Sequence, residues 1–261
     1  MTDFTMPSKH KQVNDNHQNY FSQMLELEYC PTNQLALELM VEGFAEPGTN
    51  INKFTGARYE ARYRLSKDQT PLNPTLYVEY EDLDAATRYK METSGWIDPP
   101  YAAAAGEEPA RESILESRLI LSHDFQPWNV AFNWINESDL HAGTTAFGYS
   151  LGLLRFLGTA GQGSSLSDNS LQHHQHHAGM VDEKKTDLRS NFLRLASLSI
   201  ELFGALGDSI QMGLQPSRQE HYLQPSLKFD IGNNWMLTTG VAIGLTEASD
   251  NLFRFNWGAM L

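Results

Sequence analysis

The sequence predicts an all-β protein, an antiparallel up-and-down transmembrane β-barrel, and three observations support this fold class. First, apolar and polar side chains alternate over eleven segments, which is the period of a β-strand. Second, the chain has no run of about 18 apolar residues, which excludes a transmembrane helix but not a barrel strand with one polar face. Third, short turns alternate with mostly longer loops, as they do at the two ends of a membrane barrel.

The alternation is clearest between residues 221 and 261, where three strands are predicted. In the first of these, Phe229 and Ile231 fall on one face and Lys228 and Asp230 on the other. The next two strands repeat this pattern, and the last one is rich in aromatic residues and ends on an apolar residue. A final strand of this kind is typical of the closing strand of an outer-membrane barrel.

The earlier segments follow the same rule in chain order. Residues 1–19 are polar and are expected to form a loop, and residues 20–261 are expected to form the barrel. Turns that contain Pro, Gly or Asn separate the strands, because these residues fit turns and interrupt strands. Long loops are expected at 82–111 and 207–219, and residues 158–190 form a low-complexity, His-rich insertion. The predicted strands are 20–30, 35–42, 57–65, 76–81, 115–122, 129–134, 147–153, 197–202, 222–231, 235–245 and 252–261.

The number of predicted strands is odd, whereas bacterial outer-membrane barrels have an even number. If the C-terminus lies on the periplasmic side, residue 19 falls on the outside, one strand short of closure. Residues 1–19 also lack the basic start and apolar stretch of an export signal. We therefore expect a twelve-stranded barrel of which this chain supplies eleven, with a further strand and a signal encoded upstream of Met1.

Composition narrows the functional classes. The net charge of -13 argues against a nucleic-acid partner, because phosphates require a basic surface. Cys30 is the only cysteine, so the chain can form no internal disulfide and no Cys-based metal or redox site.

Charged residues on the polar strand faces form the main candidate site. A basic side chain on the lipid face near the bilayer midplane would cost about 2–4 kcal/mol, so these residues are expected to face the lumen. An open lumen with excess acid would form a pore that prefers cations, whereas cross-strand salt bridges could instead fill it. The residues are Glu26, Glu28, Glu38, Glu42, Arg58, Glu60, Arg62, Arg64, Glu79, Glu81, Glu116, Arg118, Glu201, Lys228, Asp230 and Arg254.

Several short motifs point to a family. They are Gly56-Ala57-Arg58-Tyr59-Glu60, Leu76-Tyr77-Val78-Glu79-Tyr80-Glu81, Phe147-Gly148-Tyr149-Ser150-Leu151-Gly152, and His221-Tyr222-Leu223-Gln224-Pro225-Ser226-Leu227 leading to Gly244-Leu245-Thr246. Over residues 20–261 the chain resembles a group of largely uncharacterised, transporter-like outer-membrane β-barrel proteins of Gram-negative bacteria. The resemblance implies an outer-membrane location, contact with outer-membrane lipid and the barrel-insertion machinery, and neither cofactor nor catalytic residues. The chain departs from the family pattern in its lack of a signal peptide and first strand, and in Leu261 where a terminal Phe is usual.

The histidine cluster of the insertion is a second candidate site. His173, His174, His176 and His177 offer imidazole nitrogens that suit Zn, Ni or Cu. A defined metal site also needs a fixed second shell, which a Ser/Gly-rich segment does not supply. We therefore expect a solvated insertion without a defined metal site.

An outer-membrane enzyme would need a Ser activated by a nearby His. Ser122 and His123 are adjacent and therefore point to opposite faces of a strand, while Ser117 is too far along the same strand to reach His123. His141 and His221 lie at loop edges without an evident Ser and acid beside them. We therefore expect no enzymatic activity.

A soluble β-sandwich would show the same alternation, with its apolar faces forming the core. The near-uniform strand lengths and the aromatic residues near strand ends favour the membrane barrel. The sequence thus predicts an outer-membrane channel or transporter for small solutes with a charged lumen. The alternative is a non-conducting structural or envelope-binding barrel.

Overall fold

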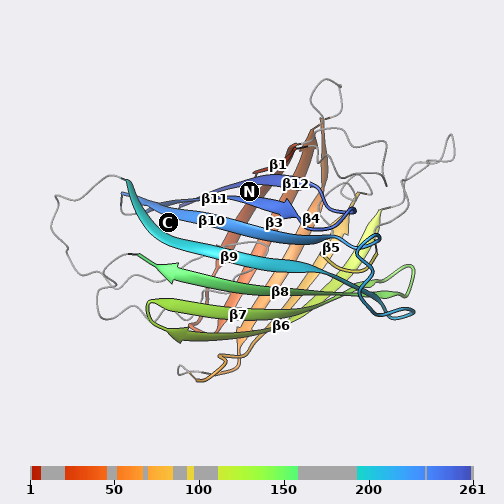
Figure 1. Ribbon diagram of the computed structural model, residues 1–261, viewed down its shortest axis with the longest axis horizontal. Coiled ribbons are helices and arrows are strands. Elements are labelled where there is room, and N and C mark those ends of the chain that lie inside the picture. Colours follow the sequence, from red (N-terminus) through yellow and green to blue (C-terminus); the bar gives the residue numbers. More distant parts are fainter. Residues whose placement is uncertain are drawn as a thin grey trace.

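The computed structural model describes residues 2–6, 21–45, 52–66, 70–84, 93–96, 111–157, 193–232 and 234–259. These residues form one antiparallel up-and-down sheet that curls so that β9–β12 cross in front of β3–β5 (Figure 1). No helix in these described ranges could span a bilayer. The strands are β1 (Thr2–Met6), β2 (Phe21–Tyr29), β3 (Leu35–Ala45), β4 (Asn52–Arg64), β5 (Thr75–Leu83), β6 (Glu112–Phe125), β7 (Trp128–Asp139), β8 (Thr145–Phe156), β9 (Leu193–Asp208), β10 (His221–Ile231), β11 (Trp235–Gly244) and β12 (Asn251–Ala259).

All eleven predicted strands are present, as β2 to β12, and each pairs with its neighbour in sequence. Several strands run further than the alternation indicates: β9 covers Leu193–Asp208, whereas the sequence predicted 197–202. Backbone pairing needs no apolar side chains, so a ladder can continue past the point where the alternation fades.

The first strand was not predicted. Residues 1–19 were expected to form a loop, but Thr2–Met6 form β1, which pairs with β12 on one side and β2 on the other. Five residues in a polar segment give too short an alternation to stand out from their surroundings. The position between β12 and β2, for which a strand upstream of Met1 was expected, is thus partly filled by β1.

The seam at β1 is the least extensively paired part of the sheet. β1 reaches only Phe21–Gln23 of β2 and Asn251–Phe255 of β12, while the other neighbouring strands pair over most of their length. The hydrogen-bonded strand order closes into a barrel through β1 alone. The eleven longer strands are by themselves an open, curved sheet.

The sheet has an apolar face that is exposed and a polar face that is enclosed. Leu27, Leu39, Tyr59, Tyr80 and Leu115 lie opposite one another across β2 to β6, and all five are exposed, Leu27 by 63%. A soluble sandwich would bury such a row, because soluble proteins rarely expose large continuous apolar patches. The apolar face is therefore the outer surface, and the polar face surrounds the interior.

The connections alternate between the two ends of the sheet. The turn end carries the short links at 30–34, 126–127 and 232–234 as well as the longest connection, residues 157–192, and the loop end carries the links at 140–144 and 209–220. The loop end also carries the long β5–β6 connection, of which residues 93–96 contact β8 and β9.

Candidate functional site

The charged residues that the sequence placed on the polar strand faces all lie on the enclosed face of the sheet. Strand alternation brings this about, because each of them is an even number of residues away from a buried neighbour on its strand. Most are buried, while Glu26, Glu28, Arg58, Arg64, Lys228 and Asp230 are partly exposed.

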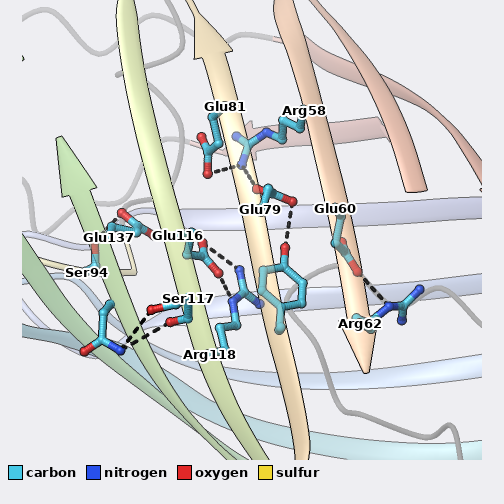
Figure 2. Close-up of polar contacts among 12 residues, drawn as sticks. Arg58, Glu60, Arg62, Glu79, Glu81, Ser94, Glu116, Ser117, Arg118 and Glu137 are labelled. Atoms are coloured by element: carbon cyan, nitrogen blue, oxygen red, sulfur yellow. Dashed lines mark hydrogen bonds and ion pairs between the residues drawn. The ribbon is translucent and has the colours of Figure 1, made fainter. Parts of the chain in front are cut away.

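Arg58 on β4 is the centre of the first cluster (Figure 2). Its guanidinium group lies 2.7 Å from Glu42 on β3, and 3.0 and 2.9 Å from Glu79 and Glu81 on β5. The planar guanidinium has five N–H donors, so one arginine can serve three carboxylates from both neighbouring strands. Arg58 thus ties β3, β4 and β5 together from the inside.

Arg62 repeats this arrangement four residues further along β4, closer to the turn end. It contacts Glu60 at 2.6 Å and Glu38 at 3.2 Å, and it also forms an ion pair with Glu28 on β2. Because each strand of β2 to β4 supplies at least one member, this cluster extends the network toward the β1 seam.

The third cluster joins β5 to β6. Arg118 forms two hydrogen bonds with Glu116, one of them 2.9 Å long, and its guanidinium carbon lies 4.5 Å from the centre of the Tyr77 ring. The Tyr77 hydroxyl donates a 2.6 Å hydrogen bond to Glu79, which connects this cluster to that of Arg58. Tyr77 was not among the predicted site residues, although it alternates with Glu79 and Glu81 on the same strand face. An aromatic residue amid charged residues of the enclosed face was the available signal.

Of the remaining predicted residues, Glu26 interacts with Glu38 of the Arg62 cluster. Glu201 accepts a hydrogen bond from Ser150, Arg254 donates to Gln224 at 3.5 Å, and Arg64 donates to the Asn33 carbonyl at 2.7 Å. Asp230 forms a half-exposed ion pair with Arg194. Glu26 and Lys228 lie on the enclosed face of β2 and β10.

The guanidinium groups of the network neutralise its carboxylates. Oxygen atoms of Glu79, Glu81 and Glu116 lie within 4.8 Å of one another, which is close enough for one cation to touch all three. Here Arg58 and Arg118 supply the positive charge to these carboxylates. Buried carboxylates need such partners, because an isolated charge in a poorly solvated interior is very costly.

Solvent hardly reaches the interior at the level of the network. Glu79 and Asn133 are 0% exposed, and Glu116 is 1% exposed. The same holds for β12 and β10 on the other side, where Arg254 and Gln224 are buried. A water-filled pore would wet the side chains that line it, so these side chains pack the interior instead.

The histidines considered as catalytic or metal-binding candidates lie in different parts of the chain. His221, at the loop end of β10, lies on the outer side, and its Nδ1 is 3.2 Å from the Tyr149 hydroxyl. Ser249 contacts the backbone of His221, not its imidazole ring. Ser122 and His123 point to opposite faces of β6, as expected from their adjacency. His173, His174, His176 and His177 lie outside the described residues.

An exposed ion pair at the loop end contrasts with the network. Arg111 donates a 2.8 Å hydrogen bond to Asp82, and this bond raises the pKa of Arg111. Both side chains are about half exposed, so water screens their attraction.

Comparison with known proteins adds no relative to these observations. No protein-family model matches this chain, and no curated protein matches it either.

We predict that Arg58→Met lowers the free energy of unfolding by about 3–5 kcal/mol, because it leaves three buried carboxylates without their shared partner. Arg111→Met removes an equally close but exposed pair and should have little effect. Urea titration of the refolded protein, followed by tryptophan fluorescence, measures both. Equal shifts for the two variants would contradict the view that the enclosed network stabilises the sheet.

Proposed function

We propose that this chain is an outer-membrane β-barrel with an interior filled by ion pairs, acting as a non-conducting structural or envelope-binding protein. One observation carries the proposal: an exposed apolar face encloses a buried charged network. This distribution is the reverse of that in a soluble protein, and a bilayer is the surrounding that stabilises it.

Strand length and aromatic positions support a membrane location. β2 to β12 have between 9 and 16 residues, and a tilted strand needs about 9–11 residues to cross a bilayer. At the turn end Tyr29, Tyr63, Trp235 and Trp257 are exposed, and the Trp235 and Trp257 rings lie 5.5 Å apart. Tyr and Trp are the residues that favour the boundary between lipid and water. The resemblance of the motifs to outer-membrane barrels points the same way.

The packed interior favours the non-conducting alternative over the channel that we expected from the sequence. A solute would have to displace Arg58, Arg62 or Arg118, each of which binds carboxylates from its own or neighbouring strands. Breaking a buried ion pair costs several kcal/mol when one partner is left behind. The loops of the loop end are then the surface that the protein offers to ligands or other envelope components.

We predict that Leu39→Arg destabilises the protein in lipid vesicles by about 2–4 kcal/mol, because Leu39 belongs to the exposed apolar row and lies near the middle of β3. The matched control is Ile210→Arg in the β9–β10 loop, where 82% of the side chain is exposed. It should change stability by about 0.5 kcal/mol or less, as surface substitutions do. Equilibrium unfolding from vesicles of both variants gives the comparison. Two small effects would argue against insertion, since an exposed position on a soluble protein tolerates arginine.

We predict that the inserted protein gives no conductance steps in a planar bilayer, because the ion-pair network fills its interior. Insertion is verified separately, by the protection of the strands from protease in the same vesicles. Discrete, cation-selective steps from inserted protein would overturn the non-conducting function and restore the channel. In that case, neutralising Glu38, Glu42, Glu79 and Glu81 together should reduce the selectivity.

A further inference from the structure

A short piece of the β5–β6 connection lies inside the barrel. Thr93 and Ser94 are 5% and 2% exposed, and they lie against β8 and β9, far from β5 and β6 in strand order. The residues that meet the segment Thr93–Trp96 include Glu137, Ala146, Gly148 and Gly207. Glu137, Ala146 and Gly148 share the enclosed strand faces with buried residues, so the segment enters the interior at the loop end.

The backbone of β8 and β9 receives this segment. Ser94 is bridged to Gly148 and Gly95 to Gly207, and the Gly95 N–H donates a 3.1 Å hydrogen bond to the Phe147 carbonyl. The pairing of β8 with β9 shifts between Phe147 and Gly148, and such a bulge redirects backbone groups away from the regular ladder. The bulge therefore provides a place where a third segment can pair.

Glycine is needed at this place. A Cβ atom on Gly148 would lie 2.2 Å from the Thr93 carbonyl oxygen, and one on Gly207 would lie 2.3 Å from the Gln211 carbonyl oxygen and 2.7 Å from the Trp96 ring. The next atoms of the barrel wall are further from the Gly148 position, with the Gly204 carbonyl at 3.4 Å. A side chain at Gly148 would thus collide with the segment and not with the wall.

Two side-chain contacts hold the segment from different elements. The Ser94 hydroxyl donates a hydrogen bond to Glu137 on β7 (Figure 2). The guanidinium carbon of Arg218, in the β9–β10 loop, lies 4.7 Å from the centre of a Trp96 ring, within the range of a cation–π contact. Contacts with the segment therefore come from β7, β8, β9 and the β9–β10 loop.

The β9–β10 loop has a fixed shape at its start. Asp208 accepts hydrogen bonds from the Ile210 and Gln211 N–H groups at 2.9 and 2.8 Å. These bonds, first that from Gln211, lower the pKa of Asp208, which lies at the loop-end tip of β9, beyond the apolar row. Gln219 is buried and binds the Gly213 carbonyl and the Gln215 N–H. The loop that carries Arg218 is thus organised by its own hydrogen bonds.

We infer that Thr93–Trp96 is a plug segment, seated in the glycine-lined bulge of β8 and β9, that closes the loop end of the interior over the charged network. Glu137, which binds the plug segment, lies opposite Glu116 in register, and Glu116 adjoins Glu79 and Glu81. Departure of the plug segment would expose these carboxylates to the outside solution. The inference concerns the barrel itself and holds whether or not the protein is in a membrane.

Cysteine labelling tests the plug segment in the folded, full-length protein. Cys30→Ser removes the single native thiol, and Thr93→Cys places a new one in the plug segment without altering Ser94 or Trp96. His141→Cys, in the exposed β7–β8 turn, reports the rate of an unprotected thiol. With a maleimide reagent in detergent micelles, the thiol at position 93 should react at least about tenfold more slowly than that at 141, because labelling requires local opening.

Substitutions at residues that contact the plug segment complete the test. Gly148→Ala should raise the labelling rate at position 93 to near that at 141, whereas Gly258→Ala on β12, which meets only the flexible Met236 side chain, should leave it unchanged. Arg218→Ala removes an exposed side chain, so it should fold normally, and it should raise the rate through loss of the Trp96 contact. Rapid labelling at position 93 in the Cys30→Ser background would overturn the inference. So would unchanged protection in both folded Gly148→Ala and folded Arg218→Ala.

Discussion

The need to neutralise charge away from water is the constraint on which this structure depends. The apolar strand faces point outward, so the charged faces are enclosed together, and carboxylates outnumber cations among them. Arg58 and Arg62 therefore each serve three acids: Arg58 pairs with Glu42, Glu79 and Glu81, and Arg62 pairs with Glu28, Glu38 and Glu60. Because those acids come from different strands, their partner also fixes the strand register: a slip by one residue would move a glutamate to the outer face.

The alternation was sufficient to predict β2 to β12 and the face of each charged residue, since a strand has only two faces. It could not predict which arginine meets which acids, because that depends on the register between strands. Tyr77 illustrates the limit: its hydroxyl joins two clusters only because Glu79 is its neighbour on the same face and Arg118 lies opposite it on β6. Likewise, nothing in the alternation indicates that the side chains meet closely enough to bury one another, as Glu79 and Asn133 are buried.

The loop contacts could not be predicted from the sequence for a related reason. Gly148 looks like an ordinary small residue of a strand face and Gly207 falls in the expected loop 207–219, and the role of both depends on a segment more than fifty residues earlier in the chain. Ser94 and Trp96 belong to a long connection whose own pattern predicts no strand. β1 was not predicted because five residues give little periodicity, and one of its two partner strands, β12, lies at the opposite end of the chain.

That last pairing has a kinetic consequence. Joining Thr2–Met6 to Asn251–Phe255 brings together residues separated by almost the whole chain, whereas every other strand pairs with its neighbour in sequence. Contacts of such long separation form slowly, because chain entropy must be lost before they contribute. We expect the sheet to grow by successive hairpins and to close at β1 last. The same short pairing would then be the first to separate, so the lifetime of the closed form depends on very few hydrogen bonds.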